Sequence, residues 1–191
     1  ISGKLEYLYR YFGKEAQDRP GQKARRQEMS EQDFLNFNGD WVRQELTQWW
    51  EGLDDDRGGR AQLRRARSAV EVALCESFQQ RLVPRLKLQP PQAQRLALAA
   101  ALLAWVRTNA EHGDHHPSLA TLMAEPGPGG ATGKVSGLRF RRLLQARTQQ
   151  ELFPLLLRAI HLIGDRAPVI ALAHDVYYWC DKIRENWAYQ Y

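Results

Sequence analysis

Arginine is the residue type whose spacing in this sequence indicates chemistry, and that chemistry is the binding of phosphate. Residues 136–147 read S-G-L-R-F-R-R-L-L-Q-A-R. At about 100° per residue, Phe140 and Leu143 fall on one side of a helix, Arg141 and Arg142 on the other, and Arg139 on a flank. No Asp or Glu occurs between positions 134 and 147. The pattern predicts a helix that packs on one side and offers uncompensated cations on the other.

A second arginine-rich stretch has the same character. Residues 57–67 read R-G-G-R-A-Q-L-R-R-A-R, with Arg60, Arg64 and Arg67 at helical spacing. Arginine suits a backbone phosphate because its planar fork donates two parallel hydrogen bonds and is weakly hydrated. Two such stretches in one chain predict a single extended anionic partner.

Both stretches have an alternative interpretation as ordinary helix surface. Their arginines would then be solvated or paired with nearby acids. We expect such pairing for Arg57, with the acids at 54–56, and for Arg67, with Glu71. We do not expect it for Arg64 or Arg65.

Metal chemistry would be sought in the segment E-H-G-D-H-H-P at 111–117. His112, Asp114, His115 and His116 are competent ligands. Their spacing matches no zinc motif, and the glycine and proline in the segment indicate a loop. The glycine-rich loop at 126–133 likewise lacks the phosphate-loop pattern G-x-x-x-x-G-K-[ST]. We therefore predict no metal, no cofactor and no catalytic residue, although a metal-dependent nuclease built on this histidine loop is a further alternative.

Five blocks of sequence occur in a fixed order. They are W-W at 49–50, G-R-A-Q-L-R-R-A at 59–66, S-G-L-R-F-R-R-L-L-Q-A-R-T at 136–148, L-A-H-D-V-Y-Y-W at 172–179 and W-A-Y-Q-Y at 187–191. This arrangement resembles the small subunit of the type I-E CRISPR surveillance complex Cascade, the CasB family, over roughly residues 41–191. The resemblance implies an all-helical, non-catalytic subunit that is present in two copies, contacts guide RNA and target DNA backbones, and steadies the displaced strand.

The expected partners are therefore guide RNA, target DNA, other Cascade subunits and a second copy of the chain. A helical transcription regulator is the alternative, and it would need a recognition helix that presents polar residues at its N-terminus. Basic residues near the chain end, among aromatic ones, join the predicted contacts. The predicted nucleic-acid-binding residues are Arg60, Arg64, Arg65, Lys134, Arg139, Arg141, Arg142, Arg147, Lys182 and Arg184.

Composition bounds the fold that must position these residues. The chain has 191 residues, of which 43% are hydrophobic, and 27 basic against 22 acidic residues. That is enough apolar material for a core, and the charge excess is informative because the arginines cluster. The apolar run at 96–106 is too short to cross a membrane, which takes about 20 residues, so we expect no membrane partner. Cys75 and Cys180, in apolar stretches, are expected to be reduced in a cytoplasmic protein.

No segment shows the alternation of period two that is typical of strands. The predicted fold class is all-α, with two packed helical bundles and no sheet. Residues 29–112 would form the N-terminal bundle and residues 113–191 the C-terminal one. Residues 1–28 lie outside the resemblance and are interpreted as an N-terminal extension or an added foreign segment, with Met29 as a candidate start.

Capping signals predict where several helices begin. Ser68 with Glu71, and Thr148 with Glu151, each form an S/T-x-x-E box. Pro154 falls inside the helix that follows Thr148, so we expect a kink or a later start. The tryptophans at 41, 49 and 50 are predicted to be core. The remaining expected limits are a helix end at Leu82 before Pro84, a buried helix that starts at Pro90, and a final helix that opens at Pro168 and includes Cys180 and Asp181.

Overall fold

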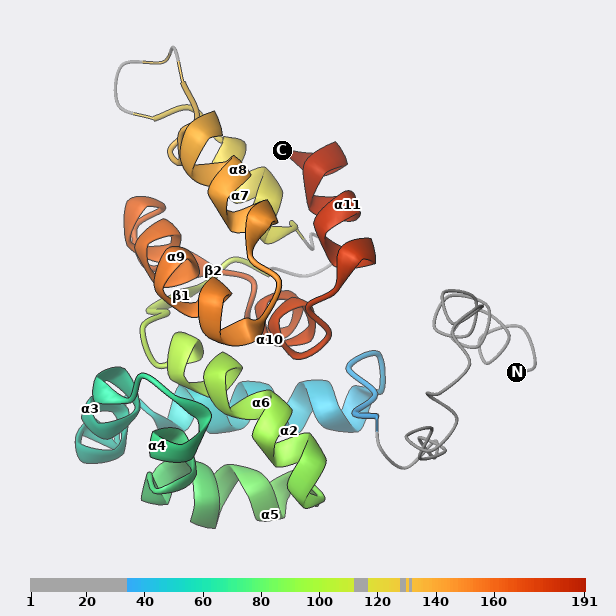
Figure 1. Ribbon diagram of the computed structural model, residues 1–191. Helices are drawn as coiled ribbons and strands as arrows, with labels where there is room; N and C mark the ends of the chain where they lie inside the picture. The colour runs from blue at the N-terminus through green and yellow to red at the C-terminus, as the bar shows by residue number, and fades with distance from the viewer. Residues whose placement is uncertain (1–33, 112–116, 128–129, 131) are drawn as a thin grey trace, which may run out of the picture. The chain divides into compact units, whose positions relative to one another are not determined.

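The computed structural model describes residues 34–191, apart from 112–116, 128–129 and 131. In this part of the chain the structure is mostly helical (Figure 1), which confirms the predicted helical class. The helices are α2 (Asp40–Gly52), α3 (Arg57–Arg65), α4 (Ala69–Ala73), the π-helix η2 (Ser77–Leu82), α5 (Val83–Arg85), α6 (Pro90–Leu103), α7 (Leu119–Ala124), α8 (Gly137–Gln145), α9 (Gln149–Leu162), α10 (Val169–Tyr177) and α11 (Asp181–Gln190). None of the described helices is long and apolar enough to span a membrane.

The expectation of no sheet is wrong in one detail. Strand β1 (Thr108–Asn109) pairs in parallel with β2 (Arg166–Ala167). The ladder continues where the amide of Ala110 donates to the carbonyl of Ala167 at 3.0 Å. Strands of two residues are too short to show an alternating pattern in sequence. The pair ties the segment that leaves α6 to the segment that enters α10.

Helix α6 forms the centre of the core. Residues 96–103 are all buried, so this part of the helix has no polar face and must lie inside the molecule. It begins at Pro90, as predicted, because a proline in the first turn loses no intrahelical hydrogen bond. It packs against α4 on one side and α10 on another, and one apolar cluster continues through these elements. The division into two bundles at 112/113 stays a prediction.

The core prediction is confirmed for Trp49 and Trp50, whose indole N–H groups both have partners, and is wrong for Trp41, which is 44% exposed near the start of α2. Trp49 Nε1 donates to the carbonyl of Ser77 at 3.0 Å. Trp50 Nε1 donates to the carbonyls of Leu103 and Val106, each at 3.2 Å. Buried indoles usually need such partners. Through Trp50, α2 holds the C-terminal end of α6, directly behind the arginine helix α3.

The helix expected from Ser68 to Leu82 is interrupted. Ser68 caps α4 as predicted, since its hydroxyl accepts from the Glu71 amide, but α4 ends at Ala73 and the chain resumes as η2. Pro84 does not end the following helix. It lies within a continuous helical stretch, because η2 leads directly into α5 and the stretch ends at Arg85.

One further predicted helix start is confirmed, and the final predicted helix is divided in two. The Thr148 hydroxyl caps α9, which begins directly afterwards and runs on through Pro154 to Leu162, so there is no later start. The final helix is divided into α10 and α11 at residues 178–180. At this break the Tyr178 hydroxyl donates to the Leu35 carbonyl (2.8 Å) and Trp179 Nε1 donates to the Ala146 carbonyl (2.9 Å). These distant bonds fix the turn in place of a continued helix.

Candidate nucleic-acid interface

Helix α3 is held in a fixed orientation by its first turn. The Asp56 carboxylate accepts from the Gly59 amide at 2.9 Å and caps the helix. A Cβ added at Gly59 would lie 2.7 Å from Ser77 Cβ and against the Asp56 carboxylate, so only glycine allows this approach to η2. Leu63 is fully buried on the same side. Consequently Arg57 and Arg65 of α3 face away from the core.

Two of these arginines are bound to the end of α6. Arg60 donates from Nε to the Ala104 carbonyl (3.2 Å) and from Nη2 to the Val106 carbonyl (3.1 Å), and it pairs with Asp54. Its side chain is only 13% exposed. Arg64 donates from Nε to the same Ala104 carbonyl at 2.8 Å. Arg60 therefore has a structural role, joining α3 to α6.

Arg64 lies in a region of excess positive charge. Its guanidinium carbon lies 5.1 Å from the centre of the Trp105 ring, a cation–π distance. Burial, followed by the positive charges of Arg60 and Arg107, lowers the pKa of Arg64. The nearby acids, Asp165 and Asp54, offset this effect only in part.

A surface hollow of about 400 Å³ lies beside α3. Arg57 and Arg65 are exposed and make no hydrogen bond or ion pair with any other described residue. The pairing expected for Arg57 is thus wrong, because Asp54 pairs with Arg60 instead. The residues that line the hollow are Arg57, Arg60, Ala61, Arg64, Arg65, Arg67 and Trp105.

The expected ion pair between the side chains of Arg67 and Glu71 is also wrong. Glu71 accepts from the backbone amide of Arg67 at 2.9 Å. The guanidinium of Arg67 instead donates to the carbonyl of Arg64 at 2.6 Å. Glu71 therefore stabilises the turn between α3 and α4. It does not neutralise the guanidinium of Arg67, which stays exposed beside the hollow.

Trp105 connects this hollow to α9. Its ring meets that of His161 edge-on, with ring centres 4.9 Å apart. His161 Nδ1 lies 2.6 Å from a carboxylate oxygen of Asp165, and Arg107 Nε lies 3.6 Å from the other. The end of α6 and the end of α9 are thus held together by one aromatic and ionic cluster.

A second, smaller hollow of about 90 Å³ lies between α8 and α9. Arg139 and Arg142 from α8 and Arg158 from α9 line it, together with apolar side chains. All three arginines are exposed and make no hydrogen bond or ion pair within the described part of the chain. Sequence reasoning missed Arg158, because it is a single arginine in an apolar helix and only packing brings it beside Arg139.

Other predicted contact residues have partners within the protein. The expectation that acids would be absent around 134–147 fails in three dimensions, since Lys134 Nζ lies 2.6 Å from Glu125 and Arg147 lies 3.5 Å from Asp181. Arg184 also pairs with Asp181 and donates to the Leu144 carbonyl at 3.2 Å; its side chain is only 12% exposed.

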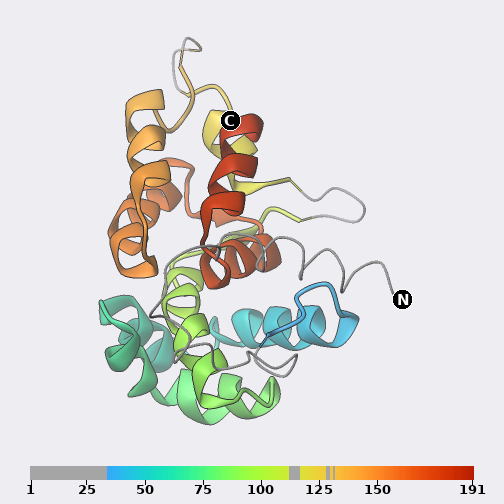
Figure 2. The same ribbon diagram turned by 45° about the vertical axis from the view of Figure 1, so that its right-hand side comes forward.

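Arg141 and Lys182 are the last predicted contact residues. Arg141 donates from Nε to the Gly137 carbonyl at 3.3 Å, and Lys182 lies 3.8 Å from Glu185. Lys182 belongs to α11, which packs on the side of α8 away from α9 (Figures 1 and 2). Arg141 is about 100° around α8 from Arg142. These two residues therefore do not line either hollow.

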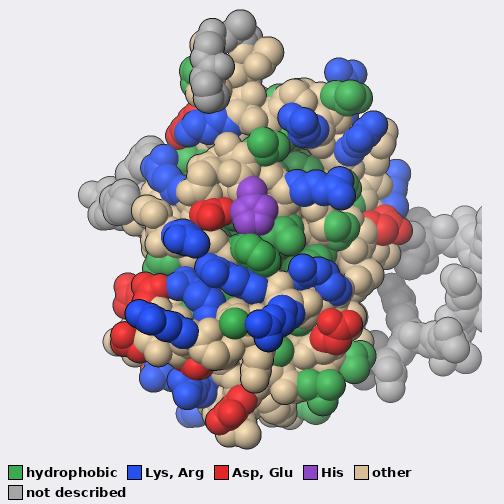
Figure 3. Space-filling view, turned by 90° about the vertical axis from the view of Figure 1, so that its left-hand side faces the viewer, with side chains coloured by type: hydrophobic (Ala, Val, Ile, Leu, Met, Phe, Trp, Pro, Cys, Tyr) green, Lys and Arg blue, Asp and Glu red, His purple; other side chains and the backbone are tan. Residues whose placement is uncertain are grey.

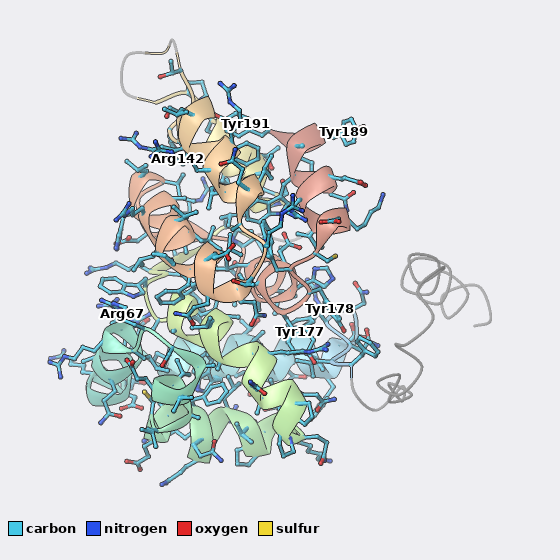
Figure 4. The ribbon with its side chains drawn as sticks, in the orientation of Figure 1. Arg67, Arg142, Tyr177, Tyr178, Tyr189 and Tyr191 are labelled. Carbon is cyan, nitrogen blue, oxygen red and sulfur yellow. The ribbon has the colours of Figure 1, made fainter. Side chains whose placement is uncertain are left out.

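Figure 3 shows the side of the molecule that carries α3, α8 and α9. Lysine and arginine side chains run across the middle of this face, and acidic side chains are fewer. Figure 4 shows Arg67, next to α3, and Arg142, on α8, projecting from this same side. Stretches about 80 residues apart in sequence thus contribute to one basic face, which we define by Arg57, Arg64, Arg65, Arg67, Arg139, Arg142 and Arg158.

Metal ligands do not gather elsewhere in the described residues, where no three of His, Cys, Asp and Glu are placed to hold an ion. The cluster at 112–116 lies outside the described residues. Both cysteines are free.

Comparison with known proteins gives one match. The chain fits the family model described as CRISPR-associated protein Cse2 over residues 59–191. No curated protein and no solved structure matches the chain significantly. The matched range includes nearly all of α3 and the whole of α8 and α9.

Proposed function

Because the chain belongs to the CRISPR-associated Cse2 family, the structural small subunit of the type I-E Cascade complex, we propose that its basic face binds nucleic-acid backbones in that complex. The contacts would be to guide RNA and target DNA, and they would stabilise the displaced strand of the R-loop. Other Cascade subunits and a second copy of the chain are the proposed protein partners. The protein would act by binding alone, without catalysis.

The observation that supports this proposal is that five arginines of the basic face are exposed and lack partners among the described residues. Arg57, Arg65, Arg139, Arg142 and Arg158 are exposed and have no partner among the described residues. Surface arginines with acids nearby gain little from an external anion. These five can each offer a full guanidinium fork to a phosphate. Such contacts position a strand without reading its sequence.

A few such contacts are sufficient for the proposed role. Opening a target exchanges one duplex for another of similar stability, with DNA stacking of about 1.4 kcal/mol per step on each side. Exposed ion pairs contribute about 0.2–1 kcal/mol each. Several such ion pairs with the displaced strand would therefore be enough to favour the opened target over the closed duplex.

The transcription-regulator alternative gains no support from the site. A recognition helix presents polar side chains to base edges from its N-terminal turn. Helix α8 carries Arg139 in its first turn, but Arg141 and Arg142 lie beyond it, so its arginines extend past the positions from which a recognition helix reads bases.

Protection of the displaced strand tests the proposal. A reconstituted, target-bound complex would be treated with a single-strand-specific nuclease, using either the wild-type subunit or one with Arg139, Arg142 and Arg158 changed to glutamine. We expect faster cleavage of the displaced strand with the variant. Arg141→Gln, on the same helix but away from α9, serves as the control and should protect like wild type. Equal cleavage in all three complexes would contradict the proposal.

A further inference from the structure

The two hollows of the basic face differ in what they can hold. Small-molecule sites typically measure about 300–1,000 Å³, so the hollow of about 400 Å³ beside α3 has room for a ring system. The hollow of about 90 Å³ between α8 and α9 does not. The larger hollow is also lined by arginines and one tryptophan, with no acidic residue.

Arg64 offers a flat, fixed surface in this hollow. Its Nε–H is bound to the Ala104 carbonyl and its guanidinium lies over Trp105, so the plane of the group is held before any ligand arrives. Nucleic-acid bases stack on arginine planes as well as on aromatic rings. The Trp105 ring behind the guanidinium steadies the cation from the other side. A base stacked on Arg64 would therefore meet a guanidinium whose position is already fixed by Ala104 and Trp105.

Phosphate binding is available at the rim of the same hollow. Arg57 and Arg65 are exposed and unpartnered among the described residues, so their forks can turn toward a ligand. Arg60 and Arg67, by contrast, donate to backbone carbonyls and form fixed walls. The hollow thus pairs a rigid stacking surface with mobile cations.

We propose that this hollow is a subsite for one unpaired nucleotide, with its base on Arg64 and its phosphate between Arg57 and Arg65. The inference rests on the proposed function and refines it. A base in a duplex is already paired and stacked, so it cannot enter without opening the pair. The subsite should therefore add affinity for single strands that carry bases, whatever the sequence.

Ala61→Phe tests the subsite, because Ala61 lines the hollow and the added ring fills it without changing any charge. The matched control is Gln62→Phe, which adds a ring of the same size to the exposed side of the same helix, away from the hollow. The probes are a labelled thymidine oligonucleotide and an abasic strand of equal length, each titrated against the purified full chain.

Ala61→Phe should bind the thymidine strand at least about fivefold more weakly, since stacking of a base contributes about 1–3 kcal/mol. Its affinity for the abasic strand should be unchanged. Gln62→Phe should match wild type on both strands. Arg64→Lys, which keeps the charge and removes the plane, provides a second variant that should lose the same base-dependent affinity.

The proposal is overturned if both Ala61→Phe and Arg64→Lys bind the thymidine strand like wild type, or if the loss is equal on the abasic strand. Failure of the proposed function itself would look different. In that case wild type would show no salt-dependent binding to either strand.

Discussion

Replacing Arg142 with glutamine tests whether the basic face binds phosphate. Arg142 is exposed, unpartnered among the described residues and next to Arg139 and Arg158 at the smaller hollow. One phosphate contact on a single strand releases about 0.7 of a counterion, so the slope of log K against log salt should become shallower by about 0.7. The affinity should fall by up to about fivefold, since an exposed ion pair contributes at most about 1 kcal/mol.

Changing all five unpartnered arginines to glutamine extends the same reasoning. The slope should then become shallower by about 3 to 4 units. Between about 50 and 200 mM salt, a slope of that size changes affinity by about 100-fold. The five-residue variant should therefore lose most of the salt dependence that wild type shows.

The assay is fluorescence anisotropy of a labelled single-stranded oligonucleotide, titrated at several salt concentrations. Arg141→Gln is the control, because it removes the same charge from the same helix, and the net charge of +5 becomes +4 in both variants. A general electrostatic effect would lower the slope equally in both. Equal slopes for Arg142→Gln and Arg141→Gln, or an unchanged slope for Arg142→Gln, would refute the phosphate-contact reasoning.

Three further predictions concern the elements that support the face. Gln149 Nε2 donates to three main-chain carbonyls at 3.0, 2.6 and 3.4 Å, so Gln149→Glu should lower the urea-measured free energy of unfolding by at least about 1–3 kcal/mol, because a carboxylate cannot donate. Gly59→Ala should cost about 1–3 kcal/mol, since the added Cβ meets Asp56 and Ser77; a melting temperature equal to wild type would contradict this. Burial, then Tyr177, raises the pKa of Tyr178 well above its ordinary value. Above about pH 10 the unfolded chain therefore ionises first, and stability should fall by up to about 1.4 kcal/mol per pH unit; Tyr178→Phe should remove this part of the alkaline loss.

Local sequence signals were sufficient for much of the helical framework. Pro90 and Thr148 predicted helix starts because N-terminal proline and hydroxyl caps act within one turn of the chain. Spacing among leucines predicted the burial of Trp49 and Trp50 but wrongly included Trp41. The strand pair could not be predicted, because two residues of extended chain carry no pattern and the pairing joins positions far apart in sequence.

The site was only partly accessible to the same reasoning. Arginine clusters pointed to α3 and α8, but which cations have partners depends on acids from other elements, such as Glu125 beside Lys134. Arg60 looks like its neighbours in sequence, yet it is bound to carbonyls at the end of α6. Arg158 joins the face only through the packing of α8 on α9. Tertiary contacts therefore decide which arginines remain available.

The most direct test of the proposed strand-holding role is the rate at which a reconstituted Cascade complex releases its target DNA. Complexes with wild-type subunit, with the five-arginine variant and without the subunit would be compared on linear and negatively supercoiled target. Complexes with the variant or without the subunit should release linear target faster, more so at higher salt, and the defect should shrink on supercoiled DNA, which favours opening independently. Equal release rates from all three complexes on both forms of DNA would contradict the account.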